Sequence, residues 1–149
     1  MAPSPASLRD VTPQMYLLDT NVVSELRKQR PHGGVLAWLT SVDDRELHIS
    51  AVTLGEIQAG VEITREQDQA KAAEIEAWAD EVAATWNVLP MDAATFRLWA
   101  KLMHRRSDTL IEDAMIAATA QVHGLRIVTR NVRDFKEFGV NVVNPYTFR

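Results

Sequence analysis

The stretch "MYLLDTNVVSEL" (residues 15–26) sets a short apolar run directly against Asp19-Thr20-Asn21 and then becomes amphipathic. An apolar run of this length followed by helical spacing predicts a buried strand and then a helix. Asp19 therefore stands where a strand ends. A carboxylate at that position has two explanations, which are a cap for the helix that follows and a ligand for a metal ion.

The same alternation of strand and helix continues along the chain. Strands are predicted at residues 15–19, 46–50, 87–91, 125–129 and 140–145. Helices are predicted at residues 21–29, from Val35, and at 51–63, 69–86, 92–106, 110–124 and 131–139, with Asp92 as an N-cap and Gly124 as a C-terminal stop. Short strands separated by helices favour right-handed crossovers and a parallel sheet. We therefore predict the α/β class, as a three-layer α/β/α sandwich with a central parallel sheet of about five short strands.

The length of 149 residues fits a single domain, which we place at residues 15–149. Residues 1–14 hold three prolines and no periodic pattern, and we predict a flexible N-terminal lead-in there. The chain has no cysteine, which excludes disulfides, thiolate metal sites and a cysteine nucleophile. No apolar stretch is long enough to span a membrane, so we expect no membrane association and a cytoplasmic location.

The net charge of −4 argues against general electrostatic binding of nucleic acid. It leaves open a nuclease whose metal ions cancel a local cluster of acids and meet the phosphate directly. Three small basic groups are present, and each is either solvated surface or a contact for phosphate. They are Arg27-Lys28 with Arg30, Arg105-Arg106, and Arg130 with Arg133.

Four carboxylates fall near the predicted carboxyl ends of the strands, where parallel sheets bind ligands. Asp19 closes the first strand, and Glu56 lies in the helix after the second. Asp113 lies in the helix that leads into the fourth strand, and Asp134 lies just after that strand. These four acids are the candidate catalytic and metal-binding residues.

Three of the four acids also suit a purely structural role. Asp19 fits the N-cap of the helix that follows it. Thr53-x-x-Glu56 matches a capping box, and Asn131-x-x-Asp134 is a looser form of the same pattern. For these three acids the structural and the functional interpretation both stay open at this point.

Asp113 is harder to explain as surface. It shares a helix face with Ile116, Ala117 and Ala120, which are expected to pack inward. An acid on a buried face is unusual unless something pairs with it. Glu112 points about 100° away on the helix and is expected to be solvated.

Four converging carboxylates repel one another unless a cation lies between them. A site made of oxygen ligands alone suits a hard ion such as Mg²⁺ or Mn²⁺. The histidines at 32, 48, 104 and 123 show no metal-like spacing. Such a site would orient a phosphodiester and activate water for in-line attack, which needs no conventional nucleophile.

Four blocks in the chain carry a resemblance to a known family. They are "YLLDTNVVSEL", "ISAVTLGEIQAGV", "EDAMIAATAQVHGL" and "IVTRNVRDF". In this order they are similar to the signature blocks of PIN-domain ribonucleases, above all the VapC/FitB-type toxins of bacterial type II toxin–antitoxin systems. The resemblance covers about residues 15–147.

The resemblance implies roles for individual residues. Asp19, Glu56 and Asp113 fall on the family's metal-site acids. The fourth acid comes from the segment 129–135, where some relatives carry it at the position of Asn131 and others at Asp134; we assign Asp134. The resemblance also implies polar residues that orient the carboxylates or the substrate, at Asn21, Thr20, Thr129 and Asn131.

The function implied is a Mg²⁺- or Mn²⁺-dependent endoribonuclease, the toxin of a toxin–antitoxin pair. The implied partners are RNA as substrate, a cognate antitoxin that blocks the acidic pocket, and a second copy of the chain in a homodimer. An apolar surface on the helices around 54–86 is a candidate contact for the antitoxin or the second copy. Trp78 and Trp86, which lie there, equally suit the core.

Two other functions compete with this one. The segment "RRSDTLIED" (105–113) departs from the family pattern and adds Asp108, which favours a catalytically weak module that keeps the scaffold and binds RNA or protein. A phosphatase or phosphoacceptor domain would use an aspartate after the first strand. Haloacid-dehalogenase-like enzymes require Asp-x-Asp there, and position 21 is Asn.

Overall fold

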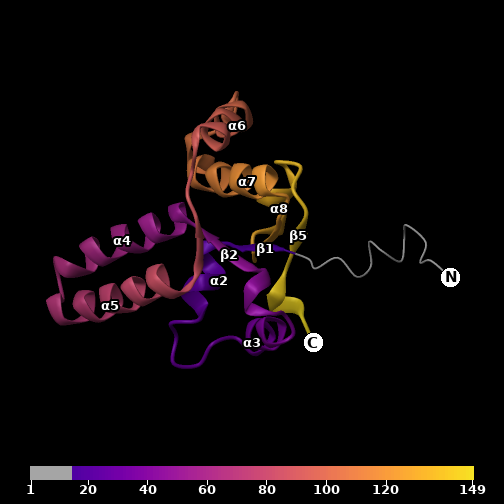
Figure 1. Ribbon diagram of the computed structural model, residues 1–149. Coiled ribbons are helices and arrows are strands. Elements are labelled where there is room, and N and C mark those ends of the chain that lie inside the picture. The colour runs from indigo at the N-terminus through magenta and orange to yellow at the C-terminus, as the bar shows by residue number, and fades with distance from the viewer. Residues whose placement is uncertain (1–14) are drawn as a thin grey trace.

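The computed structural model describes residues 15–149, and the predicted lead-in at 1–14 lies outside the described residues (Figure 1). The strands are β1 (Tyr16–Leu18), β2 (Leu47–Ser50), β3 (Asn87–Leu89), β4 (Arg126–Val128) and β5 (Val142–Val143). The α-helices are α2 (Thr20–Glu25), α3 (Gly33–Thr40), α4 (Ala51–Arg65), α5 (Gln69–Thr85), α6 (Ala93–Met103), α7 (Ile111–His123) and α8 (Val132–Lys136). Short 3₁₀ helices are η1 (Asp44–Glu46), η2 (Asp108–Leu110) and η3 (Pro145–Thr147).

The five strands form one sheet in the order β3-β2-β1-β4-β5, and every neighbouring pair is parallel. From β1 the chain adds β2 and then β3 on one side of the sheet. It then passes through α6 and α7, and β4 lies on the other side of β1. The direction of winding therefore reverses between β1 and β4. In sheets of this kind, ligands bind at the carboxyl ends of the strands beside such a reversal.

Helices cover both faces of the sheet, as the sequence predicts. Leu17 and Ile127 point to one face and pack against α7 and Phe135 of α8. The neighbouring residues Leu18 and Val128 point to the opposite face, which is covered by α2, α3, α4 and α5. Successive residues of β1 and β4 thus enter different cores, so the last two residues of each strand are apolar and buried. The α/β/α sandwich is confirmed.

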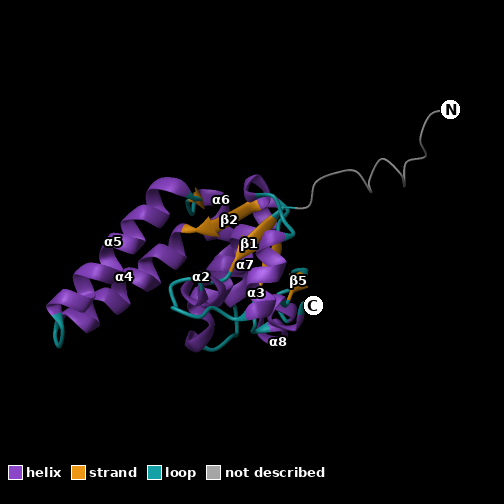
Figure 2. Cartoon of the chain, turned by 90° about the horizontal axis from the view of Figure 1, so that it is seen from below, coloured by secondary structure: helices purple, strands orange, loops and turns teal. Residues whose placement is uncertain are grey.

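Helices α4 and α5 pack side by side and extend beyond the edge of the sheet (Figures 1 and 2). An ion pair joins them, in which the Arg65 guanidinium lies 2.9 Å from the Glu76 carboxylate. No helix within residues 15–149 combines the length and the apolar character needed to cross a bilayer. Glu56 lies on the inner half of α4, close to the sheet.

The ends of the helices decide between the alternatives left open by the sequence. Asp92 is the N-cap of α6 as predicted, and Gly124 ends α7 with a left-handed φ of 67°. The capping box at Thr53 is wrong, because the N-cap of α4 is Ser50, whose hydroxyl accepts from the Val52 amide at 3.1 Å. Capping therefore does not explain Glu56.

Residues 145–148 lie against the first turn of α3, which begins at Gly33, two residues before the predicted start at Val35. A Cβ atom on Gly34 would lie 2.9 Å from the carbonyl oxygen of Pro145 and 3.1 Å from those of Tyr146 and Phe148. The absence of a side chain at Gly34 is therefore what lets residues 145–148 approach this helix.

We expect Gly34→Ala to lower the free energy of unfolding by about 1–3 kcal/mol, because three backbone carbonyls must move. Gly33→Ala is the matched control, since a Cβ there meets nothing within 4 Å. The control gains the same helix propensity without a clash. Urea denaturation followed by circular dichroism measures both, and equal stabilities of the two variants would contradict this packing.

Candidate metal centre

Asp19 is a buried carboxylate at the junction of β1 and β4. Its backbone N–H donates to the carbonyl of Val128 (2.9 Å), and its side chain is 4% exposed. Three donors reach its oxygens, namely the Thr20 N–H (2.8 Å) on Oδ1, and the Thr129 hydroxyl (2.8 Å) and Asn21 amide (3.1 Å) on Oδ2. Asp19 is therefore the N-cap of α2. Its side chain also accepts from Thr129, directly after β4, so a capping role is compatible with a place at the predicted site.

Burial raises the pKa of Asp19, and the hydrogen bonds from Thr129 and from the Thr20 backbone oppose that rise. Hydrogen bonds donated to a carboxylate favour its charged form and so work against the effect of burial. Thr129, Asn21 and Thr20 thus orient the carboxylate and support its ionised form.

Glu56 is joined to the same site through Thr20. The Thr20 hydroxyl donates to Oε1 of Glu56 at 2.9 Å, while the Thr20 backbone N–H bonds Asp19. Because a hydroxyl carries one proton, Thr20 accepts in turn from the Thr53 hydroxyl at 2.9 Å. Thr53 is fully buried, and its role as an anchor for Thr20 was not foreseen from the sequence.

Asp113 is half-buried at the start of α7, with Ile116, Ala117 and Ala120 buried behind it and Glu112 exposed beside it, as predicted. The pKa of Asp113 is raised to about 6, first by burial and then by the charges of nearby acids. Those acids are, in decreasing order of effect, Asp19, Asp134, Glu56 and Glu112. The charges of the other three predicted acids therefore all act on Asp113.

The acid predicted in the fourth block lies on α8. Asp134 is half-buried, and its charge acts on Asp113. Asn131 is exposed, and its side chain makes no capping bond at the start of α8. The looser capping box from Asn131 to Asp134 is therefore not formed, and the Asn131 backbone N–H instead donates to the Thr129 hydroxyl at 2.9 Å.

The acids share one end of the sheet without closing into a coordination shell. Within residues 15–149, no group of three or more His, Cys, Asp or Glu side chains is arranged so that it could hold a metal ion. Asp19 accepts from a hydroxyl and an amide, and Glu56 accepts from a hydroxyl. The four-ligand site stays a prediction.

Two hollows open next to the acids, between α2 and the α4–α5 pair. The first has a volume of about 230 Å³, and its lining includes Thr20 and Glu56. The second, of about 560 Å³, continues toward Lys28 and Lys71. Both are lined by Arg27, Ile75 and Trp78, so they adjoin. We call the two hollows together the α2–α5 groove.

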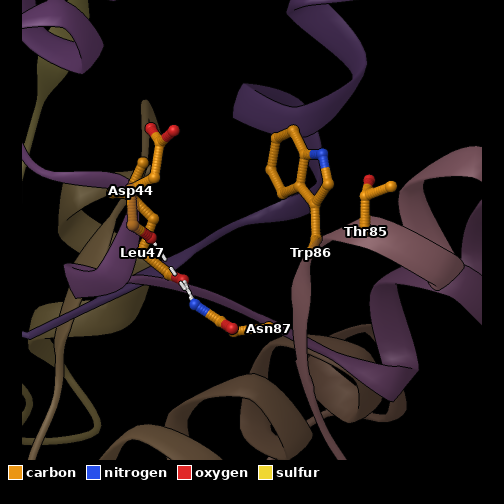
Figure 3. A pocket seen from close by; sticks show the side chains of 5 residues that line it. All are labelled: Asp44, Leu47, Thr85, Trp86 and Asn87. Atoms are coloured by element: carbon orange, nitrogen blue, oxygen red, sulfur yellow. Dashed lines mark hydrogen bonds between the residues drawn. The ribbon is translucent and has the colours of Figure 1, made fainter.

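A third hollow, of about 330 Å³, lies at the opposite end of β2 and β3 (Figure 3). Its lining includes Trp86, Asn87 and Leu47. The side-chain amide of Asn87 donates to the backbone carbonyl of Leu47 at 2.9 Å. This hollow holds none of the predicted site residues. Trp78 and Trp86 are both partly buried and pack on the core. Trp78 also lines the α2–α5 groove.

A second buried acid, not foreseen from the sequence, lies in α2. Glu25, in α2, is 5% exposed and pairs with Lys28 at 3.2 Å. Burial acts to raise the pKa of Glu25, but Lys28, the His32 backbone and Tyr146 together lower it. Glu25 lies three positions after the buried Val22, on the same face of α2. This spacing is of the kind that marked Asp113 as facing inward.

The raised pKa of Asp113 makes stability depend on pH. Because the folded pKa of about 6 exceeds the unfolded value near 4, ionised Asp113 destabilises the folded protein above about pH 6, and this cost disappears below about pH 4. Without divalent cations, we expect Asp113→Asn to raise the free energy of unfolding by about 1–2 kcal/mol near pH 7.5, since solvent screens a half-buried group. The gain should vanish near pH 4. Urea titrations at both pH values measure it, with Asp80→Asn, which removes an exposed acid of α5, as the control.

Comparisons with known proteins agree with this fold. The model of the PIN domain family matches residues 16–141. The chain is 35% identical over 143 residues to VapC ribonuclease Y4jK of Sinorhizobium fredii, covering 89% of this chain and 98% of that protein.

Two solved structures extend the likeness. The crystal structure of FitAcB from Neisseria gonorrhoeae matches with a TM-score of 0.74 and 29% identity, over 90% of this chain and 100% of that one. A toxin-antitoxin complex from Klebsiella pneumoniae matches with a TM-score of 0.61 and 27% identity, over 88% and 98%. With nearly all of its described length matched, the chain belongs to the PIN domain family.

Proposed function

We propose that this protein is a Mg²⁺- or Mn²⁺-dependent endoribonuclease that acts in the cytoplasm as the toxin of a toxin–antitoxin pair. The observation that carries the proposal is the junction at Thr20, whose backbone bonds Asp19 and whose hydroxyl bonds Glu56. Asp19, at the end of β1, and Glu56, in α4, are thereby linked through one residue. The likeness to a VapC ribonuclease over almost the full length supports the same activity.

The residues present suit a hard divalent cation. Asp19, Glu56, Asp113 and Asp134 offer only oxygen, which is the donor that Mg²⁺ and Mn²⁺ prefer. The side-chain Oδ1 of Asn21 is buried beside Asp19 and has no hydrogen-bond partner in the structure. An acceptor in that state suits a water molecule or cation next to the carboxylate. When bound, the cation would supply a water nucleophile and neutralise the charge that develops on the departing oxygen.

The chain's own residues prepare the acids for this task. Thr129 and Asn21 fix the orientation of Asp19, and Thr20 fixes that of Glu56. The negative charges of the other acids make Asp113 harder to ionise. A bound cation would counter those charges, so cation binding and ionisation of Asp113 favour each other.

The α2–α5 groove is the proposed place where the cognate antitoxin docks. It begins at Glu56 and continues along Arg27, Ile75 and Trp78, which gives an apolar floor with a charged rim. A peptide segment lying there would cover the acids and exclude RNA. The match to a toxin-antitoxin complex supports such a partner, and a homodimer forms part of the same proposal.

A non-catalytic binding module is the second candidate. It is favoured by the open arrangement of the acids, which within residues 15–149 form no compact metal-holding group. This candidate requires RNA or protein binding with no turnover in Mg²⁺ or Mn²⁺. Cleavage assays separate the two.

We expect Asp19→Asn and Asp113→Asn each to reduce metal-dependent cleavage of a total RNA pool by about 100-fold or more, because each removes a charged oxygen donor. The products of the wild type should carry 5′-phosphate and 3′-hydroxyl ends, since water attacks directly. Sequencing of the 5′ ends and gel quantification provide the two measurements.

Glu112→Gln is the matched control, because it removes an acid from the exposed side of α7 beside Asp113. Its activity should stay within about threefold of the wild type. Full activity in both Asn variants would exclude the assigned acids, whereas an inactive wild type with intact RNA binding would support the binding module.

Gly60→Gln tests the docking groove. Gly60 lines the hollow next to Glu56 and is exposed, and a Cβ atom added there would meet nothing within 4 Å, so a glutamine fits the fold while filling the groove. We expect about tenfold weaker binding of the antitoxin encoded by the neighbouring reading frame, measured by calorimetry. Gly55→Gln lies on the same helix outside the groove and should bind normally. Equal affinities would place the antitoxin elsewhere.

A further inference from the structure

An arginine stacked on a tyrosine stands at the rim of the acidic site. The guanidinium carbon of Arg130 lies 3.9 Å from the ring centroid of Tyr146, which is cation–π geometry. Arg130 is exposed, and within residues 15–149 its side chain makes no hydrogen bond and no ion pair. All of its N–H donors therefore point to solvent while the ring limits its motion.

The backbone around Arg130 is fixed to the acids. Thr129 directly precedes it and donates to Asp19, while the N–H of Asn131, directly after it, donates to the same Thr129 hydroxyl. Consecutive Cα atoms lie about 3.8 Å apart, so Arg130 begins within one residue of a direct partner of Asp19. Its position relative to the acidic site is thus set by two hydrogen bonds.

Tyr146 is fixed from the other side. Its hydroxyl lies between the backbone carbonyl of Asn21, at 3.3 Å, and the carboxylate of Glu25. Its ring also contacts His32, with centroids 5.0 Å apart. Because Asn21 bonds Asp19 in turn, the tyrosine that supports Arg130 is tied to the same end of the sheet.

An arginine held in this way has one evident use. Guanidinium groups bind phosphate through two parallel N–H bonds, and stacking on an aromatic ring reduces the entropy lost when they do so. The net charge of −4 and the four acids repel an RNA strand, so local positive charge at the rim is needed to bring the strand in. The side chain of Arg130 satisfies both requirements.

We propose that Arg130, supported by the ring of Tyr146, binds a backbone phosphate of the RNA strand next to the scissile one and so positions the substrate. This rests on the proposed function, because it assigns a substrate contact to the same site. Arg130 and Tyr146 are together called the phosphate clamp below.

The salt dependence of RNA binding tests the phosphate clamp. The probe is a fluorescein-labelled, mixed-sequence single-stranded RNA of about 12 nucleotides, and binding to the full chain is followed by anisotropy in EDTA, where turnover does not interfere. Loss of one phosphate contact lowers the slope of log K against log salt by about 0.7 for a single strand. We expect this change for Arg130→Gln, with about 3–10-fold weaker binding at low salt.

Three further variants separate a phosphate contact from a structural effect. Arg97→Gln removes the same charge from an exposed position on α6 and should leave both slope and affinity unchanged. Arg130→Lys should restore the slope and part of the affinity, because it keeps the charge without the planar fork. Tyr146→Leu should weaken binding with the slope retained, because it removes the ring that supports the guanidinium and leaves the charge in place.

A wild-type slope in Arg130→Gln, an equal loss of slope in Arg97→Gln, or no RNA binding by the wild type would each overturn the phosphate clamp. Failure of the proposed nuclease activity is distinguishable, because it shows as absent cleavage in Mg²⁺ and Mn²⁺ while the difference in slope in EDTA persists. A shift in the urea midpoint of any variant reports on folding and leaves the slope unaffected.

Discussion

The structure depends on one buried carboxylate at the junction of two parallel strands. Asp19 joins the end of β1 to β4 through its backbone, and its side chain receives donors from the residues that follow both strands. A charge that is 4% exposed is costly unless it is bonded. Its partners therefore have to come from the chain immediately around it, and this requirement places Thr20, Asn21 and Thr129 at the site. The reversal of winding between β1 and β4 explains why a site lies at this end of the sheet. The buried Asp19 carboxylate explains which hydrogen-bond donors lie around it.

The electrostatics of the remaining acids follow from that junction. Asp113 lies within the field of Asp19, and its pKa is raised to about 6 by burial and by the acids around it. The charge of Asp19 also acts on Glu56. Burial raises the pKa of Glu56, the hydrogen bond from the Thr20 hydroxyl opposes that rise, and the charges of Asp19 and Glu112 add to it. Repulsion keeps the side chains from closing on one another. The acids that raise the pKa of Asp113 are the same ones that the proposed function assigns to a cation, so the proposed affinity and the pH-dependent cost in stability have one origin.

Sequence reasoning could predict the layers and the strand ends because short apolar runs between amphipathic segments leave little freedom in a parallel sheet. It could also identify Asp113, whose apolar neighbours on α7 are visible as a pattern. It could not assign the N-cap of α4, because Ser50 and Thr53 both suit a cap and only the packed structure shows Thr53 turned inward to Thr20. Nor could it predict how closely the acids approach, because that distance depends on repulsion among side chains from four separate segments.

The residues that sequence reasoning left out lie at the end of the chain, and they show how a remote segment can shape a site. Tyr146 reaches the carbonyl of Asn21 and the buried Glu25, and nothing in the pattern of residues 140–149 indicates that contact. Its approach requires a glycine at position 34, more than a hundred residues earlier in the chain. One missing side chain on α3 thus admits the C-terminal segment, and that segment in turn supports Arg130 at the rim of the acids. The C-terminal segment thus contributes no carboxylate to the site, but it supports the positive charge beside the acids and is bonded through Asn21 to the residues that hold Asp19.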